Sequence, residues 1–377
     1  MTYCRGICLG LLSAWLCVPR AHALLNFNEG KDLVFVNASY SIGYDSNVFT
    51  RKVAQHSFTE NLSAGIDYAR QAGLISVSAS ASVSFGGFRN IRGQDFTDPS
   101  LSLAFRKRYG RTTGSLSLSA RHDSQPDPDA LQRTKAWNLG SNLDLRYPVN
   151  DRYYITNGIR TSFKFYSDKV TFSDLGAITD AIAINYIYTS KLDLNGGYTL
   201  TVSDTSFHTK AYDQSLTVGA SGGILPKLGG SVHLGIVRRD SDSVIGHRER
   251  FYSFASGSSV KWNYSRKLSF SGDVNDDFST TSTDVSVNRL SAGLHGTAAF
   301  SSRYIPTAGV TYTVSKFLGK AGGGRRDELF QFDASIGVAF TTHLRISLSY
   351  VYMLNASNVA GADFERQGLT LTLVATY

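Results

Sequence analysis

Regular alternation of apolar and polar residues is the feature that most constrains the fold of this chain. Residues 75–85 read ISVSASASVSF, with six apolar residues alternating with five serines. Because successive side chains of a β-strand point to opposite faces of its sheet, a period of two predicts a strand. Similar alternation recurs at 192–202, 330–340 and 344–352, whereas a helical period is hard to find. The chain is therefore predicted to be all-β.

Short polar turns recur along the chain at a nearly constant spacing. Most of them end in a basic residue that is followed by Leu or Tyr at the start of the next strand. The basic positions of these turns, 36 to 41 residues apart, are Arg111, Arg152, Lys191, Lys227, Lys267, Arg303 and His343. One repeat then contains two strands, one tight turn and one longer loop. Counting the repeats predicts eighteen strands, with sixteen as the alternative, and both termini on the tight-turn side.

Strand length and the chemistry of the two faces separate a membrane barrel from a soluble sandwich. A membrane-spanning strand needs ~9–11 residues, as these strands have, whereas soluble strands average ~5–6. The polar faces are small and hydroxylated, and aromatic residues gather at the ends of the apolar stripes, as Tyr350 and Tyr352 do. In hydrocarbon, only a closed barrel satisfies the backbone groups of strands. We therefore expect a single antiparallel, up-and-down transmembrane β-barrel in the bacterial outer membrane, with short turns and both termini in the periplasm.

Residues 1–23 are interpreted as a signal peptide and residues 24–377 as the barrel. Arg5 supplies positive charge, an apolar run follows at 7–18, and Ala-His-Ala at 21–23 fits a cleavage pattern. All three cysteines of the chain lie in this first segment. Disulfides and thiolate metal sites are therefore not expected in the mature chain.

Charge and side-chain types argue against several classes of function. The net charge of +8 is mild for 377 residues and is dispersed, so nucleic acid is not an expected partner. Histidines are scattered, and no Ser/His/Asp group has a recognisable spacing, so we expect no catalytic residue, no metal and no cofactor. Residues 24–31 are too few for a plug domain, and the loops are expected to be too short to constrict the lumen.

Three sequence features resemble those of known outer-membrane barrels. The segment GYDSNVFTR at 43–51 resembles the opening of the putative beta-barrel porins of the second type, some of which are found with exopolysaccharide and exosortase gene clusters. Repeated strand openings of the form [Lys/Arg]-Leu-x-[Leu/Phe]-Ser are similar to that group too. The chain ends GLTLTLVATY, and its last residue, Tyr377, resembles the terminal aromatic that recruits the barrel-assembly machinery. The resemblance implies an outer-membrane barrel and carries over no catalytic residue.

Three functions fit these observations. The first is a porin, a water-filled channel for passive passage of small hydrophilic solutes. The second is a conduit for exopolysaccharide export, and the third is a non-conducting structural or adhesive barrel. The expected partners are outer-membrane lipid, the barrel-assembly machinery, and either small solutes or polysaccharide, while the oligomeric state is left open.

Alternation also predicts which charged side chains line the lumen. They are Arg106, Arg121, Asp144, Arg146, Arg160, Lys164, Asp193, Lys261, Asp273, Arg289, Asp333 and Arg345. Basic side chains outnumber acidic ones in this set, which predicts weak anion preference if the charges act on passing ions. The alternative is that they are paired wall charges with no selective role.

Overall fold

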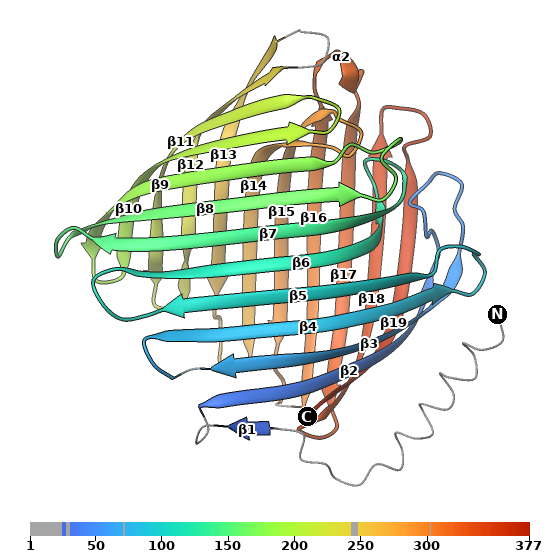
Figure 1. Ribbon diagram of the computed structural model, residues 1–377, viewed down its shortest axis with the longest axis horizontal. Helices are drawn as coiled ribbons and strands as arrows, with labels where there is room; N and C mark the ends of the chain where they lie inside the picture. The colour runs from blue at the N-terminus through green and yellow to red at the C-terminus, as the bar shows by residue number, and fades with distance from the viewer. Residues whose placement is uncertain (1–24, 28–30, 71, 243–247, 302) are drawn as a thin grey trace.

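Eighteen long antiparallel strands close into a barrel in the computed structural model, which describes residues 25–27, 31–70, 72–242, 248–301 and 303–377 (Figure 1). The barrel strands are β2 (Asp32–Asp45), β3 (Ser57–Arg70), β4 (Ile75–Phe88), β5 (Phe96–Lys107), β6 (Thr113–Asp127), β7 (Gln132–Pro148), β8 (Tyr153–Tyr166), β9 (Leu175–Thr189), β10 (Leu192–Thr205), β11 (Lys210–Leu225), β12 (Leu228–Asp242), β13 (Arg248–Trp262), β14 (Leu268–Thr280), β15 (Ser286–Ala298), β16 (Tyr304–Phe317), β17 (Arg326–Ala339), β18 (Leu344–Ser357) and β19 (Phe364–Thr376). The predicted all-β barrel of eighteen strands is confirmed. The predicted signal peptide, residues 1–23, lies outside the described residues.

Each strand pairs with its neighbours in sequence, and β19 pairs with β2 to close the ring. The strands β4–β10 of one wall cross those of the opposite wall, β14–β19, at a steep angle (Figure 1), as tilted strands of a barrel do. Tight turns such as 149–152 and 190–191 lie at one end, called here the turn end, and the longer loops lie at the other, the loop end. The four-residue helix α2 (Gly319–Gly322) belongs to one of these loops. Among the described residues, no helix is long and apolar enough to cross a membrane.

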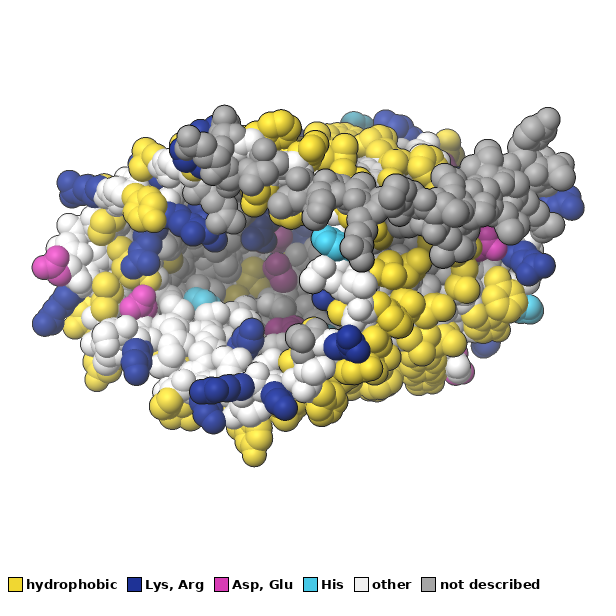
Figure 2. Space-filling view, turned by 90° about the horizontal axis from the view of Figure 1, so that it is seen from below, with side chains coloured by type: hydrophobic (Ala, Val, Ile, Leu, Met, Phe, Trp, Pro, Cys, Tyr) yellow, Lys and Arg dark blue, Asp and Glu magenta, His cyan; other side chains and the backbone are white. Residues whose placement is uncertain are grey.

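The two faces of the wall differ as the alternation predicts. On the inner face, Ser80 and Ser82 of β4 lie 2.7 Å from Ser102 and Ser100 of β5, hydroxyl to hydroxyl. On the outer face, large apolar side chains remain exposed, as Phe254 does at 76%. Hydrophobic side chains accordingly cover much of the outside, while basic and acidic side chains are visible in the hollow (Figure 2). The outer face is therefore suited to lipid and the inner face to water.

A short extra strand, β1 (Leu25–Phe27), lies at the seam of the barrel. The last residue, Tyr377, exchanges two backbone hydrogen bonds with Val36 of β2, of 2.7 and 2.8 Å. The residues of β2 before Val36, which are 32–35, extend past the end of β19 toward the turn end. β1 pairs with this overhang, at residues 32–34. Strand β1 therefore covers the part of the β2 edge that β19 does not reach. Fewer backbone groups remain unpaired at the seam as a result.

Candidate functional site

The hairpin of β6 and β7 leaves the barrel wall near the loop end. Pairing between β5 and β6 ends at Ser100 and Arg121, whereas β6 and β7 remain paired with each other as far as Asp127 and Gln132. Residues 122–135 therefore form a projecting unit, called here the tip hairpin.

Local sequence explains why the tip hairpin separates from β5. Pro126 and Pro128 have no backbone N–H and cannot donate to a strand ladder. Asp98 of β5 takes the place of the lost ladder bonds. Its carboxylate accepts hydrogen bonds from the backbone N–H and the hydroxyl of Ser124, at 3.1 and 2.9 Å, and lies 2.7 Å from Nδ1 of His122. The tip hairpin is thus anchored at its base by side chains.

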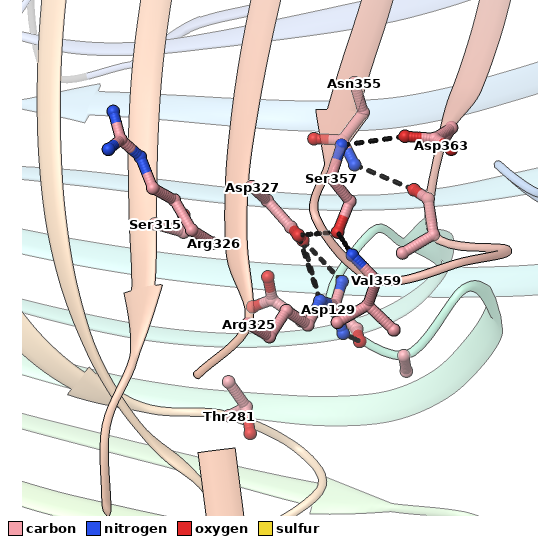
Figure 3. A network of polar contacts seen from close by, with 12 residues as sticks. Asp129, Thr281, Ser315, Arg325, Arg326, Asp327, Asn355, Ser357, Val359 and Asp363 are labelled. Carbon is pink, nitrogen blue, oxygen red and sulfur yellow. Dashed lines mark hydrogen bonds and ion pairs between the residues drawn. The ribbon is translucent and has the colours of Figure 1, made fainter. Parts of the chain in front are cut away.

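The tip hairpin crosses the lumen. Arg289 Nη2 lies 2.8 Å from Asp129 Oδ2, and the hydroxyl of Ser282 donates to Asp127 Oδ2 at 3.0 Å. Arg325 Nη1 donates to the backbone carbonyl of Asp129 at 3.0 Å, and Figure 3 shows Asp129 beside Arg325. Arg289 belongs to β15, which is nine strands from β6 in the ring of eighteen and therefore opposite it. These contacts join two opposite walls.

The tip hairpin is also anchored to the wall from which it projects. Arg51, in the loop between β2 and β3, donates from Nε to the carbonyl of Leu131 at 2.7 Å. The guanidinium of Arg133 lies 4.5 Å from the ring centre of Phe88, an inner-face residue of β4. The tip hairpin is therefore packed between the inner surfaces of two walls.

The loop between β14 and β15, residues 281–285, narrows the same end from the other side. Asp284 accepts hydrogen bonds from the hydroxyls of Thr205 and Thr209, both at 2.7 Å, and Ser282 O accepts one from Ser173 N at 2.8 Å. The expectation that no loop constricts the lumen is therefore wrong. That expectation rests on the number of residues between strands, whereas the constriction is formed largely by residues of β6 and β7 that leave the wall.

The constriction encloses a charged cavity of about 420 Å³. Acidic side chains of the tip hairpin, Asp123, Asp127 and Asp129, line it together with Lys164 of β8, Arg289 of β15 and Asp327 of β17. Charges of both signs therefore surround the cavity. Their electric field acts on any charged or dipolar solute that enters it.

Further pairing limits the net charge around this cavity. Arg121 Nη2 is 3.0 Å from Asp123 Oδ2. Arg325 Nε is 3.0 Å from Asp327 Oδ1, which also accepts a hydrogen bond from Ser357 Oγ at 2.7 Å (Figure 3). Lys164 Nζ lies 4.7 Å from the ring centre of Tyr166. Most charges at the constriction are held in fixed positions by these contacts.

The strand register locates the twelve charged residues that alternation assigns to the lumen. Directly paired residues of neighbouring strands share a face, and following the pairs around the ring puts all twelve on the face that carries Arg289. Of these, Lys164 and Arg289 line the constriction cavity. Nearer the turn end, Asp193 accepts a hydrogen bond from Tyr154 Oη at 2.6 Å, and the guanidinium of Arg146 lies 3.8 Å from the same ring. The role of the twelve in solute passage stays a prediction.

Sequence reasoning missed the acidic residues of the tip hairpin and Arg325. The available signal was the segment DSQPDPDA at 123–130, in which three aspartates accompany two prolines. Prolines at the end of a strand indicate backbone that cannot remain in a central ladder. Carboxylates on such backbone are free to project away from the wall.

A second inner-face feature is the buried Arg239 of β12, whose side chain is fully inaccessible to solvent. Its Nε lies 3.4 Å from Asp213 Oδ1, and its two terminal nitrogens donate to Ser279 O at 2.8 Å and Thr280 Oγ1 at 2.7 Å. Pairing between β13 and β14 stops at Asp276. Arg239 therefore holds the end of β14 to β12 where the backbone ladder is interrupted.

Comparisons with known proteins agree with this architecture. Residues 196–377 match the family model described as putative beta-barrel porin 2. A sequence comparison with curated proteins found no match. Among solved structures, Pseudomonas aeruginosa OccK2 (OpdF) in complex with glucuronate is 10% identical, with 93% of this chain and 100% of that chain covered and a TM-score of 0.51. P. aeruginosa OccK1 (OpdK) is 11% identical, with 91% and 99% covered and a TM-score of 0.49.

The likeness to OccK2 concerns the fold, and the family match covers the carboxy-terminal part of the barrel. That match confirms the resemblance found in the sequence motifs. Residues 196–377 match the pattern of the putative beta-barrel porin 2 family, and the described chain closes into an eighteen-strand barrel with an apolar outer face.

Proposed function

We propose that the protein is a passive, non-enzymatic channel for small hydrophilic solutes and that the charged constriction is its selectivity filter. An eighteen-strand barrel has a lumen wide enough for an aqueous channel, and its inner face carries hydroxyl and charged side chains. The observation that carries the proposal is the cavity beside the contact of the tip hairpin with Arg289, where fixed charges of opposite sign line one space.

The same geometry favours small solutes over a polymer. A polysaccharide chain would have to pass beside the tip hairpin, whose contacts with Ser282, Arg289 and Arg325 cross the lumen. A solute of a few atoms across needs only the space between these contacts. Glucuronate, the ligand of the OccK2 complex, is a small hydrophilic carboxylate of the size we expect to pass.

The proposal is tested by recording purified protein in planar bilayers. We expect a conducting pore with weak ion selectivity, because charges of both signs line the constriction. Arg160 and Lys164 share the inner face of β8, so replacing both by Gln should shift the reversal potential toward cations. Selectivity should weaken between 0.1 M and 1 M salt, as the Debye length falls from about 10 to about 3 Å.

Lys169→Gln provides a matched control for this change of charge. Lys169 is an exposed residue of the loop between β8 and β9, where its Nζ lies 3.2 Å from Asp174. The Lys169→Gln variant should leave the reversal potential unchanged. A folded barrel that carries no current would contradict the channel proposal.

We further propose that the end of β19 is the signal read by the barrel-assembly machinery. Leu369 and Leu371 are exposed on the outer face, and the ring of Tyr377 stacks on His343 with centroids 5.2 Å apart. Tyr377→Phe should keep the yield of folded barrel, whereas Tyr377→Ala should lower it several-fold. The two yields are compared by heat-modifiable gel mobility of membranes from cells, and equal yields would contradict the proposal.

A further inference from the structure

A cluster of charged side chains lies on the outer face of the barrel near the loop end. It is called here the arginine cluster, and its members are Lys210 of β11, Arg238, Asp240 and Asp242 of β12, and Arg248 and Arg250 of β13. These residues are paired across strands, Asp242 with both Lys210 and Arg248, and Asp240 with Arg250. Four basic side chains therefore accompany two acidic ones.

Asp240 fixes the position of the guanidinium groups. Its side chain is only 3% exposed, and its two carboxylate oxygens lie 2.7 Å from Arg250 Nε and 2.7 Å from Arg238 Nη2. Arg248 is more loosely held, with Nη2 3.8 Å from Asp240 and Nε 3.7 Å from Asp242. The side chains of Arg248 and Arg250 remain 61% and 51% exposed. A guanidinium has five N–H donors, so both can bind a further anion from outside.

The strand register places the arginine cluster at the edge of the lipid-facing band. Tyr252 and Phe254 follow Arg250 on the same face of β13 toward the turn end, and they are 70% and 76% exposed. Exposed aromatic residues mark the interface between hydrocarbon and headgroups in barrels. Arg250 is two residues beyond Tyr252, or roughly 7 Å along the strand. The arginine cluster therefore lies at the depth of lipid headgroups, above apolar side chains that can contact acyl chains.

We propose that the arginine cluster binds the phosphate groups of the phosphorylated glycolipid that forms the outer leaflet of the outer membrane. Guanidinium groups bind phosphate through paired, charge-assisted hydrogen bonds. The excess of basic over acidic side chains attracts an anion, and the anchoring of Arg238 and Arg250 on Asp240 limits the ordering that binding requires. A headgroup phosphate beside Arg248 and Arg250 would have its acyl chains along Tyr252 and Phe254.

The test compares the wild-type protein with Arg248→Gln/Arg250→Gln, which keeps Arg238 on Asp240. Purified barrel in detergent is titrated with lipopolysaccharide, with the same glycolipid after removal of its phosphates, and with inorganic phosphate. Bound lipid is measured by native mass spectrometry. We expect the double variant to bind lipopolysaccharide about tenfold more weakly, and the dephosphorylated glycolipid to bind wild-type protein equally weakly.

Arg326→Gln is the matched control. Arg326 lies on the outer face of β17 near the loop end, where its side chain is 53% exposed and its Nη2 is 2.8 Å from Glu328 Oε1. It should change the affinity less than twofold. If the double variant fails the folding check by gel mobility, Arg248→Gln alone removes a side chain with no contact under 3.7 Å to either aspartate, and it should weaken binding about threefold.

Three results would overturn the assignment. The first is unchanged lipopolysaccharide affinity in a folded variant. The second is inorganic phosphate binding as tightly as the glycolipid, which would reveal a general anion site. The third is a dimer in the mass spectrum of the wild-type protein that is absent from the spectrum of the double variant. A second copy of the protein would then be the occupant of the arginine cluster.

Discussion

The contact between Asp129 and Arg289 should control how stably the tip hairpin crosses the lumen. The two side chains are 22% and 40% exposed, and their closest atoms are 2.8 Å apart. A hydrogen bond between charged groups contributes about 1.5–3 kcal/mol when shielded and an exposed ion pair about 0.2–1 kcal/mol. For this half-exposed pair we take about 1 kcal/mol, which corresponds to roughly a fivefold change in the ratio of docked to undocked hairpin.

Asp129→Asn should therefore increase the undocked population about fivefold. In single-channel recordings this appears as more frequent excursions to a higher conductance. The hydrogen bonds from Ser282 to Asp127 and from Arg325 to the carbonyl of Asp129 remain, so the hairpin should still dock most of the time. Loss of the Asp129 charge by itself shifts ion selectivity, and excursions must be scored separately from the reversal potential.

A double-mutant cycle separates the contact from the two charges. Arg289→Gln alone should give excursions as frequent as Asp129→Asn, and the combination should add little to either. A coupling energy of about 1 kcal/mol supports a tether across the lumen. Additive effects, or unchanged current noise in all three variants, would refute the reasoning.

The faces, the orientation and the buried arginine give three further predictions. Val77→Arg, on the outer face, should cost roughly 2–4 kcal/mol of barrel stability, whereas Ser78→Arg on the inner face should fold normally, and equal heat-modifiability of the two would contradict the assigned faces. An epitope tag at Val170, in a loop-end segment, should bind antibody on intact cells while a tag at Asp151 should not, and the reverse pattern would invert the barrel. Arg239→Gln should lower the free energy of unfolding by about 3 kcal/mol or more in urea titrations, because it leaves a carboxylate buried without its cation.

Alternation was sufficient to predict the wall of the barrel. A period of two indicates both the strand and its face, and the recurring basic turns favour eighteen strands over sixteen. The segment 75–85 shows the reasoning at its simplest, since its serines meet other serines on the inner face.

The constriction could not be predicted in the same way. Alternation assigns a face only while a strand stays in the wall, and it does not reveal where a pair of strands leaves it. Asp127 and Asp129 reach the opposite wall because pairing with β5 stops at Ser100. The burial of Arg239 likewise depends on the interruption of pairing between β13 and β14. This interruption involves how β12, β13 and β14 are arranged together, which the alternation within one strand does not reveal.

The overlap at the seam has a consequence for how the barrel closes. An open barrel presents the edge of β2 as a template on which any foreign strand can add. Residues 32–34 of that edge are the partner of β1, so the chain carries its own competitor for the template. In the closed barrel Leu25–Phe27 and the end of β19 together occupy this edge, so a foreign strand has to displace one of them before it can add.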